Sequence, residues 1–324
     1  MKRSLRIALY LCAWASLRCD AGACSLVKVT ELPLIELGNH YAVMANVAGQ
    51  PRPMIVDTGA ATTLLGAKAV DDLNLKVDRS APLPKPVLGI GQTSASVIYL
   101  NVTAPILGFG DLVFHNRSTV VASLDFGPVP EADAAGILGD DILSDYDVEF
   151  DFLDDKLTLY DEFACSDAFL PWTGAYFALP FEHRDTKIMV DIFLNGERTP
   201  AIVDTGNNAS FVSRMTPSLW GSLTHEMKKT RMRSTSPFNG GTSLPNQRYQ
   251  FDEIRIGDDI FRDEYMKVIQ VQMPGASANL GLDFWKHRKL WISYPNDLIF
   301  VSGIKANPVL VYPVKPGASS VAKN

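Results

Sequence analysis

Several features that would point to other functions are scarce in this chain of 324 residues. Its five histidines form no HExxH or Cys–His spacing, so we expect neither a metal site nor another cofactor. The 30 lysines and arginines are outnumbered by 36 aspartates and glutamates, so no basic excess favours nucleic-acid binding. Beyond the N-terminal residues no apolar run reaches the roughly 18 residues of a membrane span, and we expect none.

The N-terminal residues resemble a signal peptide. A basic start at Lys2 and Arg3 precedes an apolar run over residues 5–17, and a small-residue cleavage pattern ends at Ala23. We therefore expect residues 1–23 to be removed and the mature chain to be periplasmic or secreted. A short buried helix is the alternative for this segment.

The four cysteines fit export. Cys12 and Cys19 would leave with the signal peptide, whereas Cys24 and Cys165 remain in the mature chain. Such a pair could form a disulfide in an oxidising compartment, although two unpaired thiols fit almost as well. A lipid anchor on Cys24 is a further alternative, because the Ala-Gly-Ala before it loosely resembles a bacterial lipobox.

A repeat divides the rest of the chain. Residues 42–57 align with residues 189–204 at an offset of 204 − 57 = 147, and residues 138–141 align with residues 280–283 at an offset of 280 − 138 = 142. Two blocks in the same order and at nearly the same spacing indicate a duplicated fold. Each block contains apolar strands broken by glycine or polar turns, as in β-hairpins.

The remaining pattern is that of an all-β chain. Short alternating apolar runs recur between Gly, Pro and Asn, and short helices are expected only at residues 62–73 and 213–223. The predicted organisation is a signal peptide (1–23), an N-terminal segment (24–32), an N-terminal lobe (33–162), a linker (163–175), a C-terminal lobe (176–303) and a flexible tail (304–324).

Each repeat carries Asp-Thr-Gly directly after an apolar strand, as MIVDTGA at 54–60 and AIVDTGN at 201–207. A carboxylate there is held rigidly, and the glycine permits a tight turn that brings backbone N–H groups to it. A single copy could be an ordinary turn in which Asp bonds its own backbone. Two equivalent copies predict instead that Asp57 and Asp204 meet. Carboxylates about 3 Å apart share a proton, so one can activate a water while the other protonates an amide carbonyl.

The sequence resembles the aspartic proteases, and within them the retropepsin-like group with two lobes duplicated in one chain. The resemblance rests on both Asp-Thr-Gly turns and on two later Gly elements, Ile137-Leu138-Gly139 and Asn279-Leu280-Gly281. It implies an all-β, two-lobed acid-protease fold, in which each lobe is a retropepsin-like β-barrel and the lobes are related by pseudo-two-fold symmetry. It assigns the catalytic pair Asp57 and Asp204, the cross-axis residues Thr58 and Thr205, and the turn glycines Gly59 and Gly206.

The two turns differ at the residue that follows Asp-Thr-Gly. Ala60 offers no side-chain donor, whereas the amide of Asn207 could donate to Asp204. We therefore expect Asp204 to be the ionised member of the pair and Asp57 to hold the proton. With fewer donors than in a pepsin, activity should persist into mildly acidic conditions.

The resemblance also implies a β-hairpin flap over the cleft in each lobe. Gly89, Ile90 and Gly91 lie in its place in the first lobe, and Gly240 and Gly241 in the second. Glycine-rich hairpin tips can close over a substrate and exclude water. An ordinary surface hairpin is the alternative, and for the second lobe it is favoured.

These features together predict an aspartic-type endopeptidase, a hydrolase of the bacterial exported type. Its partner would be a polypeptide substrate bound as an extended strand between the lobes, and the chain is expected to be a monomer. Two alternatives stay open: a non-catalytic peptide-binding protein that keeps the fold, and an obligate dimer in which one lobe is only structural.

Overall fold

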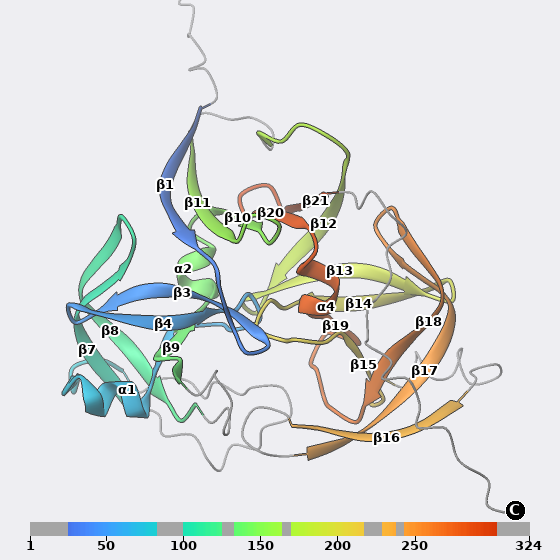
Figure 1. Ribbon diagram of the computed structural model, residues 1–324, viewed down its shortest axis with the longest axis horizontal. Coiled ribbons are helices and arrows are strands. Elements are labelled where there is room, and N and C mark those ends of the chain that lie inside the picture. The colour runs from blue at the N-terminus through green and yellow to red at the C-terminus, as the bar shows by residue number, and fades with distance from the viewer. Residues whose placement is uncertain are drawn as a thin grey trace, which may run out of the picture.

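The computed structural model describes residues 25–82, 100–124, 133–163, 170–216, 229–237 and 243–302. Two β-barrels lie side by side, with a shared sheet above them (Figure 1). This arrangement confirms the predicted all-β, two-lobed fold. The predicted signal peptide, Cys24, Cys165, both flap segments and the tail lie outside the described residues.

Strands make up most of the described chain. They are β1 (Ser25–Pro33), β2 (Ile35–Leu37), β3 (His40–Val47), β4 (Gln50–Val56), β5 (Leu64–Gly66), β6 (Lys76–Val77), β7 (Leu100–Phe109), β8 (Leu112–Ala122), β9 (Gly136–Leu138), β10 (Asp147–Asp151), β11 (Lys156–Phe163), β12 (Tyr176–Arg184), β13 (Lys187–Leu194), β14 (Glu197–Val203), β15 (Phe211–Ser213), β16 (Lys229–Pro237), β17 (Ser243–Ile256), β18 (Asp259–Ile269), β19 (Ala278–Leu280), β20 (Lys289–Ser293) and β21 (Leu298–Ser302).

Helices are short and few in the described part of the chain. They are α1 (Ala67–Asp72), α2 (Asp140–Leu143) and α4 (Leu282–Trp285). The helix expected at residues 62–73 is present as α1, while the described beginning of the second window, residues 213–216, contains no helix. None of the helices in the described ranges has the length and apolarity needed to cross a membrane.

The first barrel closes through six strands in the order β3, β4, β9, β5, β8 and β7, and a pairing of β3 with β7 completes it. Its core follows from the alternation of side chains along each strand. In β3, for instance, Val43, Ala45 and Val47 are buried in the barrel while Met44 points outward and is exposed.

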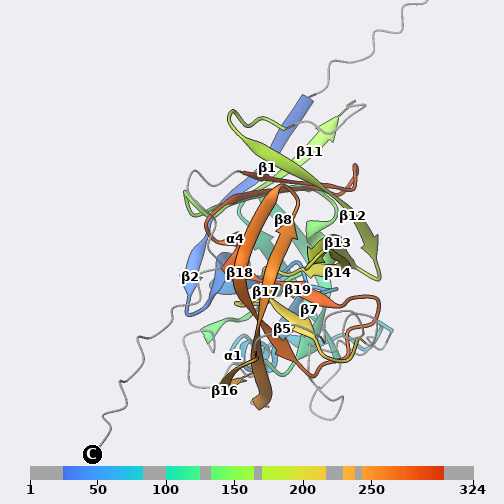
Figure 2. The ribbon, with the colours of Figure 1, turned by 90° about the vertical axis from the view of Figure 1, so that its right-hand side faces the viewer.

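The second barrel repeats the first strand by strand, in the order β13, β14, β19, β15, β18 and β17, with β13 pairing β17. The bounds of β3, β4 and β5 become those of β13, β14 and β15 when 147 is added, and β9, α2 and β10 become β19, α4 and β20 when 142 is added. The duplication read from the sequence is therefore present in three dimensions. The long β17–β18 hairpin forms the outer side of this barrel (Figure 2).

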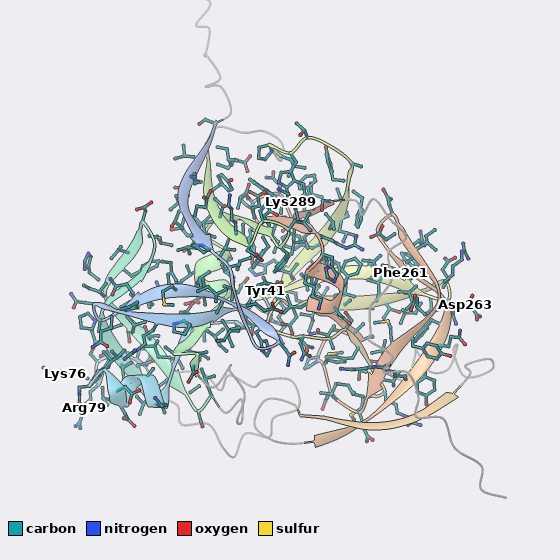
Figure 3. The ribbon with its side chains drawn as sticks, in the orientation of Figure 1. Tyr41, Lys76, Arg79, Phe261, Asp263 and Lys289 are labelled. Carbon is teal, nitrogen blue, oxygen red and sulfur yellow. The ribbon has the colours of Figure 1, made fainter. Side chains whose placement is uncertain are left out.

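A six-stranded sheet joins the two halves of the chain, in the order β1, β11, β10, β20, β21 and β12. The join is the antiparallel pairing of β10 with β20, reinforced by an ion pair between Asp151 and Lys289. Figure 3 labels Lys289 in this sheet and Tyr41 below it; the Tyr41 ring packs on Phe152 with ring centroids 5.0 Å apart. Residues 24–32, set apart as a segment from sequence, supply most of β1 and thus part of this sheet.

Candidate active site

Each aspartate of the two Asp-Thr-Gly turns stands one residue beyond the end of a buried strand. β4 pairs in parallel with β9, and β14 pairs in parallel with β19. The backbone N–H of Asp57 donates to the carbonyl of Leu138, and that of Asp204 to the carbonyl of Leu280, both at 3.0 Å. The Gly elements singled out from the sequence therefore hold the aspartate of each turn through a backbone hydrogen bond.

Thr58 and Thr205 lock the turns to each other across the lobe boundary. The N–H of each threonine donates to the hydroxyl of the other at 3.1 Å. Each hydroxyl then donates across the boundary at 2.9 Å, Thr58 to the carbonyl of Val203 and Thr205 to the carbonyl of Val56. This is the cross-axis contact that the family resemblance assigned to these two residues.

Gly59 and Gly206 let the two carboxyl groups approach. The N–H of Gly59 donates to Asp57 Oδ1 at 2.8 Å, and that of Gly206 to Asp204 Oδ1 at 3.0 Å. A Cβ placed on Gly59 would lie 2.6 Å from Asp204 Cγ, and one on Gly206 would lie 2.1 Å from Asp57 Cγ. Each glycine thus faces the opposite carboxyl, and the structure brings Asp57 and Asp204 together at the centre of the molecule.

The two carboxyl groups differ in surroundings. Asp204 is 6 % exposed, whereas Asp57 is partly exposed. Burial raises the pKa of Asp57 well above its usual range, and the negative charge of Asp204 raises it further. Burial raises the pKa of Asp204 too, but hydrogen bonds from Asn279, Asp57 and the Gly206 N–H oppose that rise. The order of these effects favours a proton on Asp57 and a charge on Asp204.

The side-chain donor to Asp204 is Asn279 and not Asn207, which corrects the expectation from the sequence. Asn279 Nδ2 donates to Asp204 Oδ2 at 2.7 Å. Asn207 Nδ2 instead donates to Asn279 Oδ1 at 3.0 Å, because the second-lobe turn directs its side chain toward β19. The predicted charge on Asp204 stays a prediction, and the side chain that would favour it is a different residue.

Part of the chain matches a known protein family. Residues 43–142, the greater part of the first lobe, match the model of the family described as aspartyl protease. This match lies within the first lobe and covers less than half of the chain. Among solved structures it is similar to the aspartic proteinase from Irpex lacteus, at 15 % identity and a TM-score of 0.47, over 87 % of this chain and 98 % of that one. No curated protein matches the chain.

A second layer of hydrogen bonds beside the two turns was not predicted from the sequence. In the first lobe the N–H of Gly139 donates to Thr63 Oγ1 at 3.0 Å, and the N–H of Thr63 donates to Asp141 Oδ1 at 2.5 Å. The second lobe repeats both bonds, with Gly281 to Ser210 at 2.9 Å and Ser210 to Asp283 at 2.8 Å. The repeat offsets relate these residues, so a comparison of the two halves would have found them.

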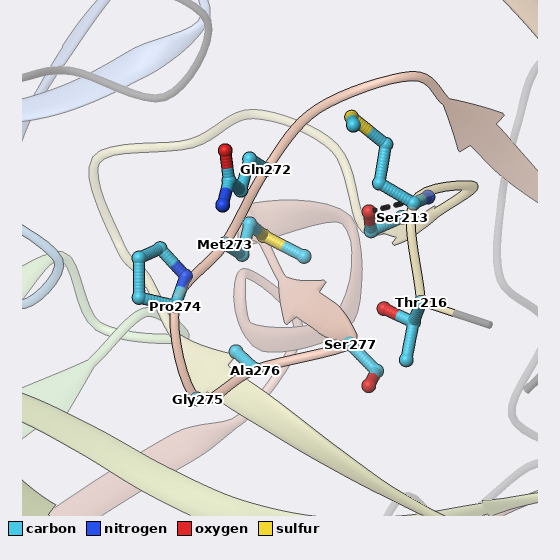
Figure 4. Close-up of a pocket in the computed structure, with 9 residues that line it drawn as sticks. Ser213, Thr216, Gln272, Met273, Pro274, Gly275, Ala276 and Ser277 are labelled. Atoms are coloured by element: carbon cyan, nitrogen blue, oxygen red, sulfur yellow. Dashed lines mark hydrogen bonds between the residues drawn. The ribbon is translucent and has the colours of Figure 1, made fainter. Parts of the chain in front are cut away.

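A hollow opens elsewhere on the second lobe. It is lined by Ser213, Met215, Thr216 and residues 272–277, and the N–H of Met215 donates to Ser213 Oγ at 3.1 Å (Figure 4). Neither Asp57 nor Asp204 is among its lining residues. Within the described ranges no three His, Cys, Asp or Glu side chains gather as metal ligands would.

Proposed function

We propose that the chain is an aspartic endopeptidase that hydrolyses peptide bonds with water activated between Asp57 and Asp204. The observation that carries the proposal is the pair of mirrored turns, in which each glycine faces the opposite carboxyl and the two threonines fix the separation. Rigid positioning of a shared-proton pair is what general acid–base catalysis by carboxyls requires.

The chemistry follows from the unequal protonation of the pair. The Asp204 carboxylate would take a proton from a water, whose oxygen attacks the amide carbon, while Asp57 gives its proton to the carbonyl oxygen. The resulting tetrahedral diol breaks the C–N bond as a proton passes from Asp204 to the departing nitrogen, and a hydroxyl proton returns to Asp57. The products are a carboxylic acid and an amine, and the pair regains its starting state without a covalent intermediate.

The substrate would be an extended peptide lying between the lobes. Extended chains bind through backbone hydrogen bonds, which are the same for every sequence, and through pockets for alternate side chains. Because burial raises the pKa of both carboxyls, the one-proton form of the pair should persist into mildly acidic solution. Activity is therefore expected there and should fall at higher pH as Asp57 loses its proton.

Incubation of the full chain with a diverse peptide library at several pH values, with and without pepstatin, tests the proposal. Cleavage in acid that pepstatin inhibits is the expected result, because pepstatin is directed at carboxyl pairs of this kind. Binding of peptides without cleavage at any pH would contradict the proposed activity and favour a peptide-binding protein that keeps the fold.

A further inference from the structure

The two Asp-Thr-Gly turns make the same hydrogen bonds, but two residues beside them differ between the lobes. The threonine bonds are equal in length on both sides, and each turn glycine donates to its own aspartate. In the first lobe the turn is followed by Ala60, and Ile137 lies on β9. The repeat offsets place Asn207 (207 − 147 = 60) and Asn279 (279 − 142 = 137) at these positions in the second lobe.

The two asparagines form a chain with a fixed direction. The N–H of Ala209 donates to Asn207 Oδ1 at 3.3 Å, which leaves Asn207 Nδ2 to face Asn279. Asn279 Oδ1 accepts that bond, so its Nδ2 must point the other way, to Asp204 Oδ2. A backbone N–H can only donate, and the polarity of every bond in the chain is therefore set by the one at Ala209.

Asn279 is fully buried, and a buried amide is stable only when its hydrogen bonds are made. Its bond to Asp204 is short, as expected for a donor to a charged oxygen. Ile137 has no polar atom in its side chain and therefore offers Asp57 no equivalent donor. Among the described residues, Lys187 also acts on the pair, and its charge favours ionised Asp204.

For the catalytic pair proposed above, we infer that Asn279, oriented by Asn207, is a positioning residue that assigns the charge to Asp204 and the proton to Asp57. The inference rests on the proposed function for its mechanistic meaning. Asp204 is then the residue that activates water, and Asp57 the one that protonates the carbonyl. The roles of two otherwise symmetric lobes are thus fixed by two amides outside the Asp-Thr-Gly turns.

Direct titration of each aspartate tests this assignment. The full chain is labelled with ¹³C at its aspartate carboxyl carbons and titrated in two variants. In Asp57→Asn only Asp204 of the pair can titrate, and in Asp204→Asn only Asp57 can. Asn279→Leu, close to asparagine in shape but without a donor, is then added to each. The pKa of Asp204 should rise by about one to two units, the equivalent of one charge-assisted hydrogen bond, while that of Asp57 stays in place.

Matched variants separate this effect from packing. Ile137→Leu, at the equivalent position of the first lobe, should move neither titration. Asn207→Ala should move that of Asp204 in the same direction but by less, and it serves where Asn279→Leu does not fold. An unmoved Asp204 in folded Asn279→Leu or Asn207→Ala protein, or an equal shift of Asp57, would overturn the inference.

The titration does not depend on turnover. If the wild-type chain cleaves no peptide, the proposed function fails, and the titrations still decide where the proton lies. If it cleaves peptides, the acid limb of its kcat/KM profile should move to higher pH in Asn279→Leu, because Asp204 then takes up a proton earlier on acidification. An active enzyme whose titrations and acid limb do not respond to Asn279→Leu would overturn only the inferred role of the asparagines.

Discussion

Gly206 leaves no room for a side chain, because the carboxyl of Asp57 occupies the space where a Cβ would stand. The nearest atom, Asp57 Cγ, would be 2.1 Å away, and both carboxyl oxygens would lie within 2.4 Å. The same holds for Gly59 and Asp204 at 2.6 Å. Glycine is therefore required at these positions because the carboxyl group of the opposite lobe fills the space, and not because of the turn in which the glycine lies.

Gly206→Ala should therefore displace Asp57 and nearly abolish peptide cleavage. The added methyl group should also lower the free energy of unfolding by about 1–3 kcal/mol, as overpacking does. Activity assays and chemical denaturation measure the two effects. Gly66→Ala is the matched control, since its nearest neighbour would be 3.4 Å away in ordinary contact; it should stay active. Full activity in folded Gly206→Ala protein would show that the carboxyls do not need this close approach.

Single residues also show which parts of the site could be predicted from the sequence. The paired Asp-Thr-Gly turns predicted that Asp57 and Asp204 meet, because a repeated motif in a duplicated fold needs only symmetry. The donor to Asp204 could not be found in this way. Asn279 was visible as a departure from an apolar pattern, but its contact with Asp204 depends on the parallel register that sets it opposite Ile202.

Among the secondary-structure elements, β12 and α2 form a polar contact between the two halves of the chain. His183 Nε2 of β12 lies 2.9 Å from Asp140 Oδ2 of α2, and the Tyr294 ring packs edge-on against the imidazole. Burial raises the pKa of the Asp140 carboxyl, and the charge and hydrogen bond of His183 oppose this rise. The contact therefore lowers the cost of burying this carboxylate. Asp140 lies close to the first Asp-Thr-Gly turn, since its N–H donates to the Ala60 carbonyl at 2.8 Å.

His183→Ala should destabilise the fold at neutral pH more than in acid. Without His183 the pKa of folded Asp140 rises further above its unfolded value, so an ionised carboxylate is penalised only in the folded state. The loss, about 1–2 kcal/mol, should be complete above the folded-state pKa of Asp140 in the variant. It should disappear as the pH falls below the folded-state pKa of Asp140 in the wild type, because the folded carboxyl is then protonated in both proteins.

Urea denaturation near pH 7 and near pH 3 measures this difference. His115→Ala, an exposed histidine on β8, is the control and should change stability by less than about 0.5 kcal/mol at either pH. An equal loss for His183→Ala at both pH values would mean that the imidazole contributes packing alone and that the Asp140 contact is without electrostatic consequence.

On the scale of the whole molecule, the lobes could be predicted but the sheet that joins them could not. Each barrel is encoded by a local repeat, so its strands follow from alternation and turns within about half the chain. The shared sheet pairs segments from both halves, as in the register of β10 on β20, and the pairing of β1 with β11 recurs as that of β12 with β21. Such long-range partners are not specified by any local pattern.

The shared sheet and the threonine contact hold the two halves in a fixed relation at the paired carboxyls. Thr58 and Thr205 hydrogen-bond to each other across the lobe boundary, while the β10–β20 pairing joins the two halves in the shared sheet. Neither lobe carries a complete pair of carboxyls, so the proposed chemistry belongs to the molecule as a whole. One asparagine chain in the second lobe then makes two equivalent aspartates unequal.

The measurement that tests the account most directly is peptide cleavage by Asp57→Asn and Asp204→Asn, each compared with the wild type at its best pH. Both variants should keep the fold, judged by circular dichroism, and each should lower kcat/KM by at least about a hundredfold, because either carboxyl alone lacks half of the acid–base cycle. Asp154→Asn, whose side chain is 66 % exposed in a surface turn, should remain fully active. Near-wild-type cleavage by either folded active-site variant would contradict the shared pair.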